Sequence, residues 1–252
     1  MPHREYVRIV PGAETAVLFL HGIVGTPRHF DSRLPLVHLV PKNVSVYSLL
    51  LPGHGGTVED FSRSTMHQWK EYVWKTFDAL AQTHCQVILA GHSMGTLFAL
   101  QLAREFPEKI PLLFLIAAPI CPQLSLAAVA HSFGLIFPHC HGDPKITAAM
   151  GSCGSVTLTK KLWKYLPWIP NFWNLLGQAR RTKKSLPYIS TKTLIFQSCR
   201  DELVARRSVK HLQKISKLQL HELQQSTHFY YSEEDTCLVQ QAFVNVLREV
   251  TG

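Results

Sequence analysis

Three polar residues in this 252-residue sequence have the types and the order that acyl transfer by a serine requires. Ser93 lies in a Gly-x-Ser-x-Gly pattern at residues 91–95, and Asp201 and His228 follow much later in the chain. A serine hydroxyl is a poor nucleophile unless a base accepts its proton. That base is usually a histidine, which a carboxylate holds in the right tautomer. The three residues therefore suggest a nucleophile, its base and the acid that orients the base.

The sequence around Ser93 predicts a sharp turn between a strand and a helix. Residues 87–90 form an apolar run typical of a buried parallel strand, and residues 97–105 are good helix formers with an apolar face. A serine at such a turn tends to have a strained backbone, so its neighbours must be small. Gly91 and Gly95 meet this requirement, because they have no Cβ and allow the strand and the helix to approach closely.

The other two candidates also follow predicted strands. Asp201 comes after an apolar strand at residues 193–198, and His228 comes after an alternating strand at residues 218–223. The carboxyl ends of parallel strands share one edge of a sheet. We therefore expect both side chains to converge with Ser93 at that edge.

Other acids and histidines compete for the same roles. Glu202 neighbours Asp201 and could be the acid, but it should point elsewhere if Asp201 points inward. Asp143 is a weaker candidate, because it lies in a different segment of the chain. His221 lies within a predicted strand and should face the sheet or solvent, and His211 lies in the middle of a predicted helix and should be exposed.

Glycine-containing loops follow two further strands. An apolar strand is predicted at residues 16–20, and the loop at residues 21–27 begins with His-Gly. Such a loop can present backbone N–H groups to a reacting oxygen, or it can be a plain turn. With the serine turn downstream, we favour the first interpretation. His54 lies in the glycine-rich turn after a strand predicted at residues 44–51, where a structural role is favoured over a catalytic one.

The remaining pattern alternates strands with helices, as expected of an α/β fold with a mostly parallel sheet. Thr65 or its neighbour Ser64 can cap a helix that ends near residue 82. Further strands are predicted at residues 6–10 and 112–118, and further helices at residues 30–40, at residues 206–217 and after Ser232.

The net charge of +9 is concentrated in one segment. Residues 119–190 contain eight lysines and arginines against Asp143 alone, whereas residues 1–118 and 191–252 each have a net charge of +1. The same segment is rich in aromatic residues and lacks strand–helix alternation. We therefore predict a helical cap at 119–190, inserted into a core formed by 1–118 and 191–252. The sequence contains no nucleic-acid-binding motif, so we expect no nucleic-acid partner.

The six cysteines lie far apart and have no paired spacing, which predicts free thiols in a cytoplasmic protein. The N-terminal residues are polar and lack the apolar region of a signal peptide. The longest apolar run, at residues 112–121, is too short to cross a bilayer.

A group of potential metal ligands lies within the predicted cap. It consists of His139, Cys140, His141 and Asp143, with Cys153 further along. The spacing fits no known zinc pattern, and a loop of solvated histidines is the interpretation that we favour. We predict no metal and no organic cofactor.

Taken together, five segments resemble small bacterial-type carboxylesterases and monoglyceride lipases of the α/β-hydrolase superfamily. The resemblance implies an α/β-hydrolase fold with the triad Ser93, Asp201 and His228, and an oxyanion hole made by the backbone N–H groups of Ile23 and Met94. One departure is Thr227, since many relatives have glycine before the histidine. The matching segments are residues 20–27, 51–55, 91–95, 201–204 and 226–228.

We therefore expect a serine hydrolase that cleaves carboxylic esters of apolar acyl groups through an acyl-enzyme. A peptidase, a thioesterase or a carbon–carbon bond hydrolase could use the same triad, and a ligand-binding protein without turnover is the alternative outside enzymes. The aromatic cap and its single carboxylate, Asp143, favour an apolar ester over a peptide, because a free N-terminal amine is usually recognised by an acidic group.

Basic residues flank an apolar stretch at residues 162–176 of the predicted cap. Such a pattern is typical of a segment that inserts apolar groups into a membrane surface while its cations meet anionic lipid. Alternatively, the apolar residues line the acyl pocket from inside and the lysines solvate the outer face. We favour the second interpretation and regard a weak association with anionic membranes as the alternative.

Overall fold

Apolar segments of the chain form one seven-stranded sheet in the computed structural model, which describes residues 3–137 and 143–251. The strand order is β1-β3-β2-β4-β5-β6-β7. Only β1 and β3 pair antiparallel, and all other neighbours are parallel, which confirms the predicted fold class. In chain order the strands are β1 (Tyr6–Arg8), β2 (Thr15–Leu20), β3 (Ser45–Ser48), β4 (Gln86–His92), β5 (Leu112–Ile116), β6 (Lys192–Ser198) and β7 (Leu218–Leu223).

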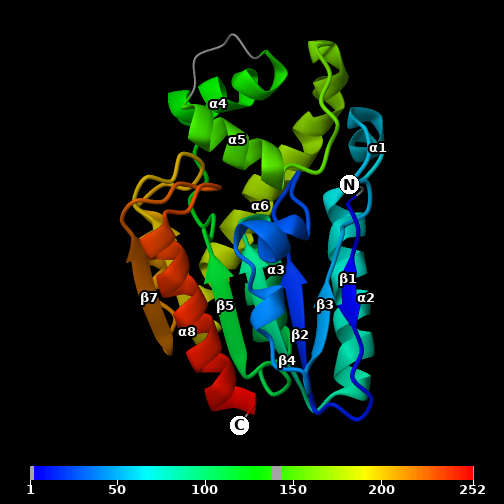
Figure 1. Ribbon diagram of the computed structural model, residues 1–252, viewed down its shortest axis with the longest axis vertical. Coiled ribbons are helices and arrows are strands. Elements are labelled where there is room, and N and C mark those ends of the chain that lie inside the picture. Colours follow the sequence, from blue (N-terminus) through cyan, green and yellow to red (C-terminus); the bar gives the residue numbers. More distant parts are fainter. Residues whose placement is uncertain (1–2, 138–142, 252) are drawn as a thin grey trace.

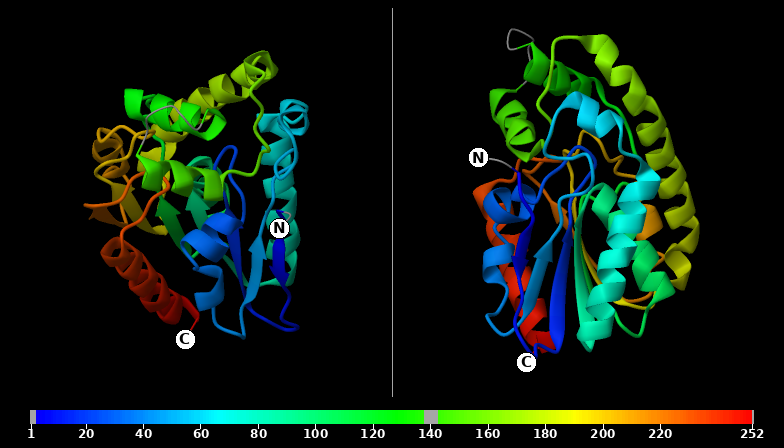
Figure 2. Two further views of the ribbon diagram at one scale, coloured as in Figure 1. Left: turned by 45° about the horizontal axis from the view of Figure 1, so that its top comes forward. Right: turned by 90° about the vertical axis from the view of Figure 1, so that its right-hand side faces the viewer.

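Helices cover both faces of the sheet and bury its apolar side chains (Figure 2). The inner strands are apolar on both faces, as expected of a parallel sheet between two helical layers. The first layer contains α2 (Met66–Thr83), α3 (Met94–Glu105) and α6 (Ile169–Ser185), and the second contains η1 (His29–Arg33), η2 (Val37–Leu39) and α8 (Glu233–Thr251).

The helix predicted after residue 65 is confirmed, and its local sequence explains where it begins. The Thr65 side chain accepts a hydrogen bond from the Gln68 N–H, and the Gln68 side chain accepts one from the Thr65 N–H. This capping box satisfies N–H groups that the first turn of α2 would otherwise leave unpaired. Trp69 and Phe77 lie on the predicted apolar face and are fully buried.

Two predicted helices are wrong in extent. The segment 30–40 forms two short helical pieces instead of one helix, because Pro35 disfavours helical backbone at Leu34, whose φ and ψ are −123° and 91°. The segment 206–217 contains only the short helix α7 (Ser208–Leu212) followed by turns. A further short helix, α1 (Val58–Ser62), was not predicted.

The chain between β5 and β6 forms a set of helices and loops. Its first two helices lie beyond the carboxyl edge of the sheet, and α6 begins there and then runs down beside α3 (Figure 1, Figure 2). Gln101 of α3 donates hydrogen bonds to Gln178 and Thr182 of α6, and Ala179 belongs to the buried core. Besides α6, this set comprises α4 (Leu126–Ile136), α5 (Pro144–Cys153), η3 (Leu162–Trp168) and η4 (Leu186–Tyr188).

Among the described residues, no helix has both the length and the apolar character needed to cross a bilayer.

The packing of α8 against the sheet gives a stability prediction. The ring of Phe243 is fully buried, 4.9 Å from the Phe114 ring and 6.0 Å from the Phe19 ring between centroids. Phe243→Ala should lower the free energy of unfolding by about 3–5 kcal/mol, because it removes buried apolar surface and leaves a cavity. Urea denaturation measures the loss. The exposed Arg248→Ala on the same helix is the control, and an equal effect of both variants would contradict the assigned core.

Candidate active site

Ser93 occupies the sharp turn between β4 and α3. Its φ of 52° and ψ of −122° lie in a region that residues other than glycine rarely adopt. The flanking glycines make the turn possible, because a Cβ added at Gly95 would lie 2.0 Å from the Leu20 carbonyl oxygen and one at Gly91 would lie 3.0 Å from Thr96 backbone atoms. The expected strand, turn and helix are therefore present around a strained serine.

The structure brings Asp201 and His228 together behind this turn. The His228 Nδ1–H donates to the carboxylate of Asp201, at 2.9 and 3.0 Å from its two oxygens. The same carboxylate accepts the backbone N–H groups of Leu203 and Val204, each at 2.8 Å. These bonds fix the acid in place, and the bond from Nδ1 leaves Nε2 of His228 as the ring atom that can accept a proton.

The electrostatic surroundings of His228 favour its charged form. Burial by itself lowers the pKa of this fully buried imidazole, but the charge and hydrogen bond of Asp201 and the charge of Glu202 outweigh it and raise the pKa above 6.5. A histidine with a raised pKa is a stronger proton acceptor than a buried imidazole without an acid partner.

Ser93 and His228 lie at the same edge of the sheet and are linked through His92. The Nε2–H of His92 donates to the His228 carbonyl oxygen at 3.1 Å, and the two rings lie 4.9 Å apart between centroids. Among the hydrogen bonds of the described residues there is none between Ser93 Oγ and the His228 ring. In unliganded sites this bond is often long and forms only when substrate binds.

His21 holds the loop that contains Ile23. Its Nε2 accepts the Leu51 N–H at 3.1 Å, so its Nδ1–H donates to the Gly22 carbonyl oxygen at 2.8 Å. Burial lowers the pKa of His21 to about 4, so the ring is neutral. Because a trans peptide directs its C=O and N–H to opposite sides, the Ile23 N–H points away from His21.

The two amides expected to form an oxyanion hole carry no hydrogen bond within the described part of the chain. The Ile23 N–H and the Met94 N–H are both without an acceptor, and Gly22 lies against Ser93. A Cβ at Gly22 would lie 2.9 Å from Ser93 Cβ. Met94 directly follows Ser93, and Ile23 directly follows Gly22, so both unpaired donors belong to backbone next to the serine.

Two further buried histidines surround the serine turn and were not predicted from the sequence. The ring of His29 stacks on that of His92, with centroids 3.7 Å apart. Burial lowers the pKa of both rings well below 6.5, so both are neutral. The Cys153 thiol lies 3.7 Å from His29 Nδ1, and burial raises its pKa to about 11. This cysteine is therefore a neutral thiol.

We expected Glu202 to point away from the site if Asp201 points towards it, and this expectation is wrong. Its Oε2 accepts the backbone N–H of His228 at 3.1 Å, and its side chain is buried. Asp201 instead binds the imidazole ring, so the two acids hold different parts of His228. Two adjacent carboxylates in the sequence were the available signal for this second contact. In a strand they would point to opposite faces, but in this turn both reach His228.

The other candidates lie outside this arrangement. Asp143 caps the N-terminus of α5, where its carboxylate accepts the Lys145 N–H at 2.8 Å. The His221 ring stacks on Phe196 in the sheet, and His211 lies half-buried on α7 rather than exposed. The Thr227 hydroxyl accepts the Tyr230 N–H, so it is turned towards its own loop.

His54 lies in a packed environment that suits the structural role favoured from the sequence. It is buried against His21 and Trp69, with ring centroids 4.9 and 5.0 Å away, and burial lowers its pKa well below 6.5. Its ring therefore packs against His21, the first residue of the loop that carries Ile23.

No group of three or more potential metal ligands occurs within residues 3–137 and 143–251. His139, Cys140 and His141 lie outside the described residues. The five cysteines of the described segments are free thiols, as predicted.

The apolar stretch of the inserted segment mostly faces outward. Trp168 is buried, and its indole N–H donates to Ser62 Oγ. By contrast, Trp163 and Trp173 are 64% and 69% exposed. The favoured expectation that these side chains line an internal pocket is therefore wrong for the residues that we call the apolar patch, which are Leu162, Trp163, Leu166, Ile169, Phe172 and Trp173.

The comparisons with known proteins agree with this architecture. A model of the alpha/beta hydrolase family matches residues 17–237, which is most of the chain. The chain therefore belongs to the alpha/beta hydrolase family.

Similar proteins include lipases. A thermostable monoacylglycerol lipase of Bacillus sp. (strain H-257) is 31% identical over 132 residues, which cover 48% of this chain and 51% of that lipase. This chain therefore matches about half the length of that relative. A structure of metagenome-derived lipolytic enzymes has a TM-score of 0.70 at 19% identity and covers 96% of this chain and all of its own. The Paleococcus ferrophilus monoacylglycerol lipase has a TM-score of 0.67 at 16% identity, covering 99% of both chains.

The backbone of Ser93 gives a prediction about stability. Its positive φ and negative ψ are tolerated best by glycine, and strain of this kind costs about 1–3 kcal/mol. Ser93→Gly should therefore be more stable than Ser93→Ala by about 1 kcal/mol, after the greater flexibility of glycine in the unfolded chain is counted. Thermal unfolding of the two variants measures the difference. Equal stability would show that the turn is not strained.

Proposed function

We propose that this chain is a carboxylic ester hydrolase whose nucleophile is Ser93, whose base is His228 and whose orienting acid is Asp201. The observation that carries the proposal is the buried Asp201–His228 pair, which lies at the sheet edge where the strained turn presents Ser93. The serine, its base and the acid occur in the order of the family to which the chain belongs.

The mechanism assigns one step to each group. His228 Nε2 takes the proton of Ser93 Oγ as the oxygen attacks the ester carbonyl, and the N–H groups of Ile23 and Met94 stabilise the oxyanion. His228 then protonates the leaving alcohol, which leaves an acyl-enzyme on Ser93. Water, activated by the same histidine, releases the acid and restores the serine.

Apolar esters are the substrates that we favour. The relatives described as monoacylglycerol lipases support this choice, although the curated lipase matches only about half of this chain. The helical segment 119–190 is proposed as the cap over the site, and its single carboxylate, Asp143, is used to cap α5. The segment therefore offers little negative charge for the recognition of a peptide's N-terminal amine. A cytoplasmic location stays a prediction, supported by free cysteines.

Triad variants test the assignment of roles. Ser93→Ala should remove p-nitrophenyl butyrate hydrolysis, and Asp201→Asn should lower kcat by a factor on the order of 10⁴ while the fold is kept. A fluorophosphonate probe should label Ser93 of the parent and leave Ser93→Ala unlabelled.

Glu202→Gln is the matched control for the acid. It keeps an oxygen that accepts the His228 N–H, so its loss should be far smaller than that of Asp201→Asn. Activity of Ser93→Ala within tenfold of the parent would refute the nucleophile, and a reversed order of the two acid variants would make Glu202 the acid. Aminoacyl anilides, assayed beside butyrate and octanoate esters, should be the poorer substrates.

The pKa of His228 predicts the pH dependence. The base must be neutral, so kcat/KM should rise with pH and reach half its maximum at the raised pKa, above 6.5. In Asp201→Asn the charge that raises this pKa is gone, so the midpoint of the residual activity should move to lower pH. Profiles of kcat/KM measured between pH 5 and 8 test both statements. A midpoint that stays fixed in the variant would show that another group limits the rate.

We further propose that the apolar patch docks on anionic lipid. Tryptophans and leucines exposed on one segment are suited to the headgroup boundary, and the neighbouring Lys160 and Lys161 are exposed cations. Lys164, also nearby, is ion-paired with Glu59. The attraction therefore combines apolar insertion with an electrostatic contribution from these exposed cations, which salt screens.

Sedimentation with lipid vesicles tests the docking. The protein should co-sediment with anionic vesicles at low salt, release at high salt, and bind little to neutral vesicles. Trp163→Ser with Trp173→Ser should abolish the binding, whereas Tyr188→Ser, at a side chain 72% exposed elsewhere, should not. Equal recovery in the supernatant with both vesicle types would reject the docking.

A further inference from the structure

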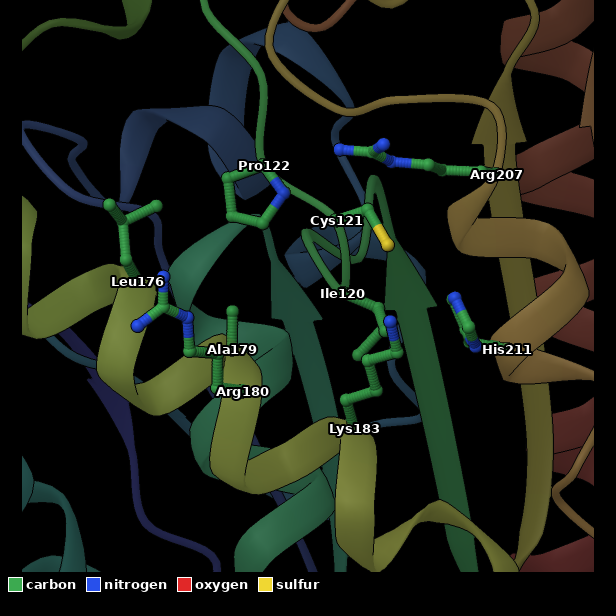
Figure 3. Close-up of a pocket in the computed structure, with 9 residues that line it drawn as sticks. All are labelled: Ile120, Cys121, Pro122, Leu176, Ala179, Arg180, Lys183, Arg207 and His211. Carbon is green, nitrogen blue, oxygen red and sulfur yellow. The ribbon is translucent and has the colours of Figure 1, made fainter.

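A groove on the side of the molecule has an apolar floor. It has a volume of about 460 Å³ and lies between α6, the loop after β5, and the start of α7 (Figure 3). This volume is in the range of sites that hold small organic ligands. The floor is formed by Ile120, Pro122, Leu176 and Ala179.

Positively charged side chains surround this floor. Arg180 and Lys183 belong to α6, Arg207 precedes α7, and His211 lies on α7. Figure 3 shows Lys183 extending from α6 towards Ile120, His211 on the opposite wall, and Arg207 extending towards the loop that carries Pro122. Among the described residues that line the groove there is no carboxylate.

The cations around the floor, which form the rim of the groove, have no acidic partner among the described residues. Within the described residues, the side chains of Arg180, Lys183 and Arg207 make no hydrogen bond or ion pair, and Arg206 next to them is instead paired with Glu222 at 3.6 Å. Partial burial and the nearby charges of Lys183, Lys214 and Arg207 lower the pKa of His211. A positive potential therefore covers the groove, and an anion would relieve the repulsion.

Hydrogen bonds join one wall of the groove, at Cys121, to the segment that follows β6. The Cys121 N–H donates to Ser208 Oγ at 3.0 Å, and the Ala205 N–H donates to the Cys121 carbonyl oxygen at 2.9 Å. A wall fixed in this way does not have to be ordered when a ligand binds, which favours binding. None of Ser93, Asp201 and His228 lines the groove.

We propose that this groove binds an amphiphilic anion, with an alkyl chain on the apolar floor and a carboxylate or phosphate head against Lys183 and Arg207. The site is separate from the proposed ester hydrolysis. Its occupant could be a fatty acid or an alkyl phosphate, which share this chemistry.

Equilibrium dialysis of the full chain with decanoate, decyl phosphate and decanol, each below its micellar concentration, tests the site. Lys183→Gln with Arg207→Gln should weaken decanoate or decyl phosphate binding at least tenfold. Lys184→Gln with Lys210→Gln, which removes the same charge from exposed positions outside the groove, should leave binding unchanged. Decanol should bind more weakly than the anions, and the stronger of the two anions identifies the head group.

A photoactivatable fatty acid locates the site independently of these variants. Crosslinks should map to residues 120–122 and 176–183, and Arg180→Glu, which adds a carboxylate to the rim, should reduce them. Equal binding by both double variants, or crosslinks confined to other segments such as the peptide that contains Ser93, would overturn the proposal. Neither readout depends on ester hydrolysis, so loss of the proposed activity and loss of this site are distinguishable.

Discussion

The close approach of α3 to the sheet at Gly95 is the constraint on which the candidate site depends. Any Cβ here would overlap the Leu20 carbonyl, so the first turn of α3 can lie against β2 only because the residue is glycine. The approach also places Ser93 against Gly22, on the loop that offers the free Ile23 N–H. The N–H of Ser93 is held by the Ile116 carbonyl at 3.0 Å, so the surrounding structure maintains the strained turn.

The buried histidines around this turn differ in whether a carboxylate contacts the ring. His21, His29 and His92 are removed from water without a carboxylate partner, so burial keeps them neutral and they serve as hydrogen-bonding and packing groups. His228 is equally buried, but Asp201 compensates for its lost hydration and raises its pKa. One paired acid thus distinguishes His228 electrostatically from the other buried imidazoles, which a count of histidines in the sequence does not reveal.

The sequence predicts the parts of this molecule that depend on local patterns. The strand and helix on either side of Ser93, the capped helix after Thr65 and the parallel sheet all follow from apolar periodicity and turn residues. The buried contact of Glu202 with the His228 N–H could not be predicted, because it joins segments that only the folded loops bring together. The helix expected at 30–40 is interrupted for a local reason. Its apolar pattern predicted a continuous helix, but Pro35 disfavours helical backbone at Leu34.

The basic character of the inserted segment also divides once the chain is folded. Consecutive helical residues are rotated by about 100° around the axis, so a run of adjacent cations cannot face one way. On α6, Arg180 and Lys183 therefore line the groove towards α7, whereas Arg181 and Lys184 line another groove beside Arg104. The apolar patch lies at the other end of this helix and on η3. The positive charge of the segment is consequently divided among separate surfaces and does not form one membrane-binding face.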